Sequence, residues 1–209
     1  MNSVEDKYFL GDWKLSDKRG ILSIEKIGET YKCIWKINKD STSYEYFGIG
    51  MLVDNRLFIS RYHNEVPMAG IGMYKAIGDL RSNSALWAST QSFNTLGSGI
   101  ALRKETSENF EGNYKVRYFV KEYESPVFDL NIVKKEQNDN LYNLNWAVNN
   151  EMQLHGIGMI HNGQMFLAYG GISFDYEIVI LNYDNTTSEL NEKYASTSNC
   201  NINEEIYIR

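Results

Sequence analysis

The chain has 209 residues, a formal net charge of −6 and a sequence pI of about 5.2. This acidic balance gives no electrostatic case for nucleic acid or an anionic membrane, so we expect neither as a partner. The segment Met1 to Gly11 is charged and contains no apolar run that suits a secretory signal, and no stretch approaches transmembrane length. We therefore expect a cytoplasmic protein.

Apolar and polar residues alternate in short runs along the chain, which predicts antiparallel strands with one buried and one wet face. In the first half we expect strands near residues 7–14, 19–27, 30–38, 44–54, 56–63, 70–78, 85–92 and 98–104. In the second half we expect them near residues 112–121, 127–136, 141–149, 153–161, 164–171, 174–183, 190–197 and 203–209. No long amphipathic helix is evident, so the sequence predicts an all-β fold.

The two sets of strands follow an internal repeat. Gly48-Ile49-Gly50-Met51 recurs as Gly156-Ile157-Gly158-Met159, and other landmarks recur in the same order. A third copy, at residues 70–73, shows that the tetrapeptide alone is weak evidence, so the prediction depends on the ordered set. We expect Gly48 and Gly50 to lie where a strand coils sharply or a bulky neighbour crosses it.

The repeat predicts two domains, residues 1–106 and residues 107–209, each a closed antiparallel meander barrel of about eight strands. Closure is favoured because it removes the exposed edges that an open sheet would leave. The alternative is one larger barrel, or a continuous sheet, that is built from both repeats.

A family resemblance supports the barrels. Gly11-x-Trp13, followed by a meander that ends at Arg103, resembles the calycin pattern of lipocalins, fatty-acid-binding proteins and avidins. The second unit has Gly112-x-Tyr114 and ends at Arg209, with tyrosine in place of tryptophan. In that superfamily the tryptophan packs across the barrel floor and the last-strand arginine lies over it. The resemblance implies a fold and the binding of a small, often hydrophobic molecule, but it transfers no specific site residues.

Aromatic and hydroxyl residues that recur in both units are the candidate ligand-binding surface. Inward-facing aromatics of small barrels can line a ligand cavity, although core packing is the alternative for them. Serines beside an aromatic ring can orient a polar group of a ligand, although a wet strand face is the alternative there. The candidates are Tyr31, Trp35, Trp87, Ser89, Tyr142, Trp146, Tyr194 and Ser196.

No residue set predicts catalysis, a metal site or a cofactor. The histidines His63, His155 and His161 have no counterparts in the other unit. Cys33 and Cys200 occupy non-equivalent places and lack neighbours at zinc-site spacing, so reduced thiols are expected.

The sequence thus favours a non-catalytic protein that binds a small apolar or aromatic molecule in one or both barrels. The alternative is a protein-interaction module with solid barrels and an acidic second unit, and an isomerase or hydrolase that uses a barrel mouth is a third hypothesis. Residues 1–104 carry 14 Lys and Arg against 11 Asp and Glu, whereas residues 105–209 carry 7 against 16. These opposite signs favour docking of the two units, with a solvated acidic surface as the alternative.

Overall fold

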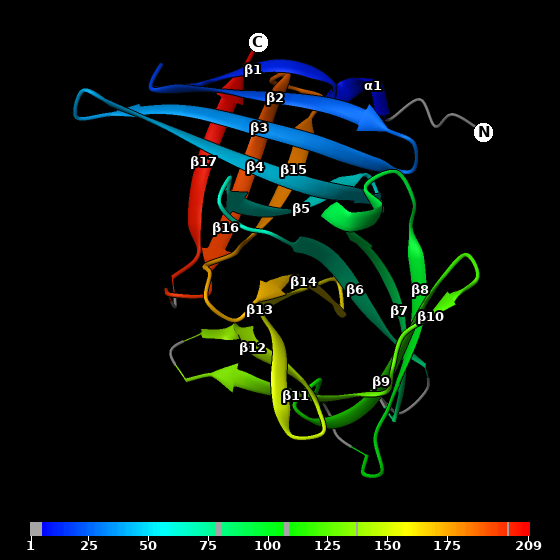
Figure 1. Cartoon of the computed structure of the whole chain (residues 1–209). Coiled ribbons are helices and arrows are strands. Elements are labelled where there is room, and N and C mark those ends of the chain that lie inside the picture. The colour runs from blue at the N-terminus through cyan, green and yellow to red at the C-terminus, as the bar shows by residue number, and fades with distance from the viewer. Residues whose placement is uncertain (1–5, 78–80, 107–108, 137, 200) are drawn as a thin grey trace.

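The computed structural model describes residues 6–77, 81–106, 109–136, 138–199 and 201–209, and its strands close into two antiparallel barrels of eight strands each (Figure 1). The first barrel contains β1 (Gly11–Leu15), β2 (Gly20–Ile27), β3 (Thr30–Lys39), β4 (Thr42–Val53), β5 (Arg56–His63), β15 (Glu177–Asp184), β16 (Glu189–Ser196) and β17 (Asn203–Ile208). The second contains β6 (Ala69–Ile77), β7 (Ser82–Ser89), β8 (Gly97–Leu102), β9 (Gly112–Val120), β11 (Phe128–Lys135), β12 (Asn138–Val148), β13 (Glu151–His161) and β14 (Gln164–Gly171). The predicted fold class of two eight-stranded barrels is confirmed.

Short elements complete the chain. The two-residue strand β10 (Tyr123–Glu124) pairs with β9 at the rim of the second barrel. A helical turn, α1 (Asp6–Phe9), occupies the start of the strand that we expected at residues 7–14, and a 3₁₀ turn, η1 (Thr90–Ser92), follows β7. In the described ranges, no helix is both long enough and apolar enough to cross a membrane.

Each barrel takes strands from both halves of the chain. In Figure 1 the orange and red strands β15 to β17 lie with the blue strands of the first barrel, because β5 pairs with β15. The chain leaves the first barrel after His63, builds the whole second barrel between residues 69 and 171, and then returns. The predicted division into residues 1–106 and 107–209 is therefore wrong for the strands. The cause is that β6 closes the second barrel on β14 instead of forming a hairpin with β5.

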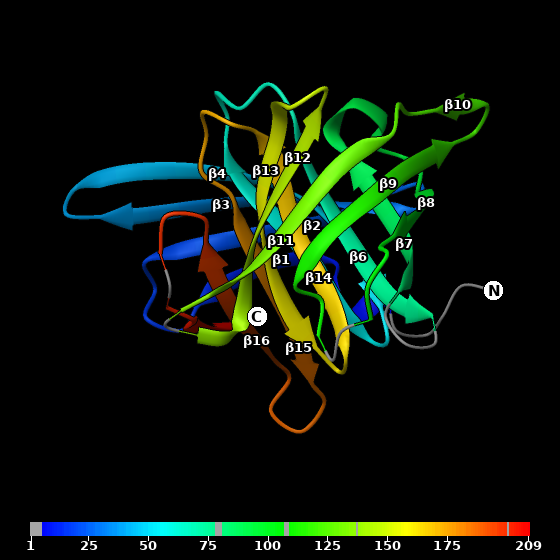
Figure 2. The same cartoon turned by 90° about the horizontal axis from the view of Figure 1, so that it is seen from below.

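Each barrel has its own apolar interior. The first is filled by residues that include Trp13, Trp35 and Tyr207, and the second by residues that include Tyr142, Leu144 and Trp146. The aromatic stripe predicted to face inward therefore does so in both barrels. Figure 2 shows the molecule from the side of the second barrel.

A third core lies between the barrels. The rings of Phe58 on β5 and Phe166 on β14 stack with centroids 3.4 Å apart and planes at 3°. They occupy the same place in the repeat, as do Ile49 and Ile157 in the same cluster. Equivalent faces of the two barrels therefore meet, as in a symmetric dimer interface.

The glycine of the first repeated tetrapeptide allows a close crossing. A Cβ on Gly48 would lie 2.8 Å from Cζ3 of Trp35 and 2.6 Å from Cγ2 of Ile59. Since real Cβ atoms do not approach other atoms so closely, the ring of Trp35 requires glycine on the neighbouring strand. This confirms the expectation that a bulky neighbour crosses the strand there.

The floors of the barrels pair an arginine with a ring. The guanidinium of Arg209 lies 4.6 Å from the ring centroid of Trp13, whose Nε1 donates a 2.8 Å hydrogen bond to the carbonyl of Phe9. In the second barrel, Arg103 lies 5.1 Å from the ring of Tyr114. Each arginine thus covers the ring of the other half of the chain, because the closing strands β8 and β17 are exchanged.

Candidate ligand-binding pocket

The second barrel contains a pocket of about 650 Å³. Its walls come from strands of the second barrel and from loops beside them, and small residues such as Gly72 and Ala85 leave room between the larger ones. Seven aromatic side chains line it: Tyr74, Trp87, Tyr118, Tyr123, Phe128, Trp146 and Tyr169. A concave pocket of this size with several aromatic side chains in its lining is typical of small-molecule sites.

Several polar atoms of the aromatic lining are hydrogen-bonded to the protein. The Nε1 of Trp146 donates a 2.7 Å hydrogen bond to the hydroxyl of Tyr118, which also bonds to the hydroxyl of Tyr74. The Nε1 of Trp87 donates a 2.9 Å bond to the carbonyl of Ser98. In the bond between the two phenols only one of their two hydroxyl hydrogens is donated, so within the described residues the other hydroxyl hydrogen of the Tyr74–Tyr118 pair has no acceptor.

The pocket is close to neutral. Among the described residues that line it there is no Lys, Arg or His, and Glu151 is the only carboxylate. Burial raises the pKa of Tyr74 and of Tyr118, so both phenols keep their hydrogens at physiological pH. The site therefore offers ring faces and a neutral hydroxyl pair.

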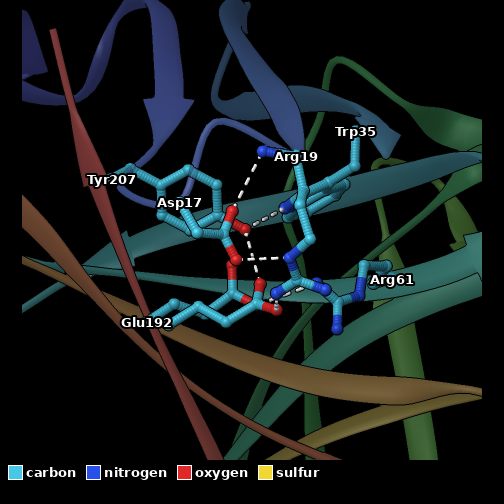
Figure 3. A network of polar contacts seen from close by, with 7 residues as sticks. Asp17, Arg19, Trp35, Arg61, Glu192 and Tyr207 are labelled. Atoms are coloured by element: carbon cyan, nitrogen blue, oxygen red, sulfur yellow. Dashed lines mark hydrogen bonds and ion pairs between the residues drawn. The ribbon is translucent and has the colours of Figure 1, made fainter. Parts of the chain in front are cut away.

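The same space in the first barrel is filled by a buried ion pair (Figure 3). Arg61 on β5 donates from Nη1 to Oε1 of Glu192 at 2.8 Å, and it also pairs with Glu177. The side chain of Arg61 is 5% exposed and that of Glu192 is 0% exposed. The guanidinium lies 4.4 Å from the ring centroid of Tyr194 and 5.2 Å from that of Trp35.

The two charges of this pair respond differently to burial. Burial lowers the pKa of Arg61, but the charges of Glu192 and Glu177 raise it more, so the guanidinium stays protonated. Burial raises the pKa of Glu192, and Arg61 offsets only part of that rise. Hydrogen bonds join the surrounding groups, since Trp35 donates to the hydroxyl of Tyr207 at 3.2 Å.

Strand pairing identifies the counterparts of these residues. Arg61 pairs with Gly48 as Tyr169 pairs with Gly156, so Tyr169 occupies the place of Arg61. By the same comparison of partners, Gly70 replaces Glu177, Ala85 replaces Glu192 and Ala101 replaces Tyr207.

The pocket follows from these replacements. Three large side chains of the first barrel become glycine or alanine in the second, and the ring of Tyr169 lies directly over Gly70, where a Cβ would be 2.2 Å from its Cζ. The ring therefore fills the space of one side chain only, and the rest of the volume stays open.

Three of the eight candidate residues meet in the pocket: Trp87, Ser89 and Trp146. Tyr142 lies in the core of the second barrel, away from the pocket lining. The remaining four candidates, Tyr31, Trp35, Tyr194 and Ser196, belong to the first barrel, where Tyr31 donates to Asp6 and the Ser196 hydroxyl lies 3.3 Å from that of Ser198. The structure does not bring the eight residues together.

Sequence comparison of the halves missed Tyr74, Tyr118 and Tyr169. Their counterparts in the first barrel are not aromatic, so a search for shared positions passes over them. The signal that could have found them is a difference between the repeats. An inward aromatic residue whose counterpart is not aromatic marks a place where the two barrel interiors differ.

The repeated Ala-Ser-Thr segments have a structural role. Ala88 and Ala195 pack in the core between the barrels. The hydroxyl of Thr90 accepts a 3.2 Å hydrogen bond from the backbone N–H of Ala69, and that of Thr197 accepts one at 3.1 Å from Tyr176. Each threonine side chain therefore holds the backbone at the start of a strand, β6 for Thr90 and β15 for Thr197.

Other candidate chemistry is limited. In the described parts of the chain, no group of three His, Cys, Asp or Glu residues could hold a metal ion. His155 instead bonds through Nε2 to the carbonyl of Phe174 at 2.7 Å. Cys33 is a buried free thiol, and Cys200 lies outside the described residues.

A second hollow, of about 670 Å³, lies beside β15 to β17 and the segment from Leu15 to Arg19. Its lining is mostly polar or charged and includes Asp17, Glu205 and Lys193. It lacks the aromatic walls of the pocket in the second barrel.

Comparison with known proteins gives no match, because no family model fits the chain and no curated protein or solved structure is significantly similar to it.

Proposed function

We propose that the chain is a small-molecule-binding protein and that the second barrel holds an apolar or aromatic ligand. The observation that carries the proposal is the difference between the interiors of two barrels that share the same strand arrangement. Arg61 and its carboxylate partners fill the first interior, whereas glycine and alanine at their counterparts leave a pocket of about 650 Å³ in the second. Rings around that pocket supply apolar area for a flat or bulky hydrophobic molecule.

The hydroxyl pair of Tyr74 and Tyr118 gives the ligand an orientation. Its spare hydrogen can be donated to an acceptor on the ligand, and a neutral hydrogen bond of this kind contributes about 1 kcal/mol. A ligand with an apolar body can therefore also place an acceptor, where it has one, against these phenols.

Two further expectations belong to the same proposal. The arginine-over-ring floors at Trp13 and Tyr114 support a calycin-like identity for both barrels, for which binding in the barrel is the usual role. The cytoplasmic location inferred from the sequence is the second expectation.

The test combines native mass spectrometry with a pocket-filling variant. Protein purified from its source cells should carry a small molecule, and the neutral dye N-phenyl-1-naphthylamine should fluoresce on binding. Ala85→Leu places a larger side chain on the pocket wall and should abolish both signals. Ala147→Leu is the matched control, because Ala147 pairs with Asp129 in the same barrel and does not line the pocket.

The outcomes separate binding from folding. Loss of dye binding in Ala85→Leu, with a far-ultraviolet circular dichroism spectrum like that of wild type, supports the proposal. A wild-type protein that binds neither dye nor co-purified molecule, or an Ala85→Leu variant that binds as well as Ala147→Leu, refutes it.

A protein-interaction role is the second candidate, and the filled first barrel favours it there. Because Arg61 and Glu192 are buried inside that barrel, the polar groups that a partner could contact lie on its outer surface. An affinity pull-down that recovers a stoichiometric protein partner, equally with wild type and with Ala85→Leu, would support this role. Recovery of no partner would count against it.

A further inference from the structure

We infer that the pocket of the second barrel selects an organic cation of diffuse charge, such as an aryl quaternary ammonium or a flat aromatic cation, over a carboxylate. The inference rests on the proposed function and specifies the charge of its ligand. Three features of the two interiors lead to it. They are the positions that hold an aromatic ring in both barrels, the charges of the pocket lining, and the carboxylates that the second barrel lacks.

The first barrel shows what its ring pair accommodates. The guanidinium of Arg61 lies over Trp35 and Tyr194, at 5.2 and 4.4 Å from their ring centroids. Both distances are within the range of a cation–π interaction. The first barrel thus contains, as part of its own chain, a flat cation held against two aromatic rings.

The second barrel keeps these rings and lacks the cation. Trp146 is the repeat counterpart of Trp35, because each pairs in the same register with the strand that follows it. Trp87 has the place of Tyr194, because each pairs in the same register with the strand that precedes it. Both tryptophans line the pocket, whereas Arg61 is replaced by Tyr169. The faces of tryptophan are the strongest cation–π acceptors among side chains, so an external cation in the open part of the pocket, beside the ring of Tyr169, can interact with them.

The charges of the lining oppose an anion. A carboxylate that enters the pocket loses its hydration, and the described lining residues include no Lys, Arg or His to compensate for that loss. Glu151 would repel it from the rim and would attract a cation. A fatty-acid-like ligand is therefore disfavoured.

The missing carboxylates specify the kind of cation. The first barrel surrounds Arg61 with Glu177 and Glu192, whereas the second has Gly70 and Ala85 at their places. A compact primary ammonium ion is strongly hydrated and would enter without an adequate partner. A quaternary or delocalised cation is weakly hydrated and interacts well with ring faces, so it suits the pocket better.

The test uses three ligands of similar shape on the full chain. They are 2-naphthyltrimethylammonium, its neutral isostere 2-tert-butylnaphthalene, and 2-naphthoate, each titrated by calorimetry or by displacement of N-phenyl-1-naphthylamine. The cation should bind about tenfold more tightly than the neutral isostere, a difference that one or two cation–π contacts supply. The carboxylate should bind most weakly.

Variants test the cause of the preference. Trp87→Leu should weaken the cation several-fold more than the neutral isostere. Glu151→Gln should weaken only the cation, and Glu25→Gln, an exposed acid on β2 of the first barrel, should change neither. Because Glu151 is exposed, its replacement tests the charge without the risk to folding that a core change carries.

Failure of this inference differs from failure of the proposed function. If the neutral isostere binds as tightly as the cation, or the carboxylate binds best, the charge preference is refuted while binding in the pocket stands. If none of the three ligands binds wild type while N-phenyl-1-naphthylamine does, the inference alone is refuted. If the dye does not bind and no small molecule co-purifies, the proposed function is refuted as well.

Discussion

Replacement of Arg61 by methionine should destabilise the first barrel strongly. Methionine keeps much of the apolar volume, so the change removes mainly the charge and its hydrogen bonds. Glu192 would then lose its partner at Oε1, while its Oε2 already has no hydrogen-bond partner among the described residues. A buried carboxylate would be left without the cation that pairs with it.

The structure sets the expected magnitude. With Arg61 5% exposed and Glu192 0% exposed, this is a buried pair, and removal of one partner of such a pair costs about 3–5 kcal/mol. The double variant Arg61→Met with Glu192→Leu leaves no buried charge in the pair. It should recover most of the loss and lie within about 1 kcal/mol of wild type, because apolar replacements of buried ion pairs are often neutral.

Urea unfolding followed by tryptophan fluorescence measures both free energies, with the change in midpoint as the readout. The pH dependence supplies an independent check. Burial raises the pKa of Glu192 above its ordinary value of 4.5, so its contribution to folding is most favourable below that value and is lost as the pH rises through the raised pKa. Without Arg61 this loss grows, so Arg61→Met should be less destabilising at about pH 5 than at about pH 8.

The reasoning would be refuted by additivity. If Arg61→Met costs under about 1 kcal/mol, or if Glu192→Leu adds to its cost instead of relieving it, the two groups are not coupled as the geometry requires. A destabilisation that is the same at both pH values would exclude an unpaired Glu192 as its cause.

Three other predictions concern the architecture. A fragment of residues 69–171 contains all eight strands of the second barrel and should unfold cooperatively in urea, whereas residues 107–209 lack three of them and should not. Phe58→Ala should cost about 3–5 kcal/mol in the same assay, because its ring packs between the barrels, and a cost near zero would contradict that packing. Arg209→Met should cost about 1 kcal/mol and shift the fluorescence of Trp13, and an unchanged spectrum would count against their contact.

Local patterns predicted the strands well. Residues 56–63 and 164–171 were expected as strands and form β5 and β14 with those bounds. The alternation of apolar and polar residues predicts strands well because each strand has one face toward a core. The pattern therefore depends only on residues that are neighbours in sequence. The helical turn at Asp6–Phe9 escaped the prediction because four residues are too few to show a helical period.

The pocket was harder to predict, because it depends on differences between the halves. Trp87, Ser89 and Trp146 were found since they recur, but the open volume depends on Ala85, and Gly70 makes room for the ring of Tyr169. Neither small residue bears a chemical signal of its own. They become informative only when strand pairing shows that they are the counterparts of Glu192 and Glu177 in the other barrel.

Strand exchange was the feature that local patterns could not give, since a strand at 69–77 has the same alternation whether it pairs with β5 or with β14. The longer connections, residues 64–68 and 172–176, are compatible with either path. What distinguishes the two arrangements is long-range chemistry.

Charge complementarity accounts for the arrangement observed. If each half closed on itself, Arg61 would face Gly70 and Ala85 and would have no carboxylate within its barrel. Glu177 and Glu192 would then surround Tyr169, so the other interior would contain two acids without a cation. Exchange of β6–β8 with β15–β17 brings Arg61 to both acids and confines every one of these charges to a single interior. Because an unpaired buried charge costs several kcal/mol, the ion pair selects the exchanged strands, and the same selection leaves the second barrel neutral and open.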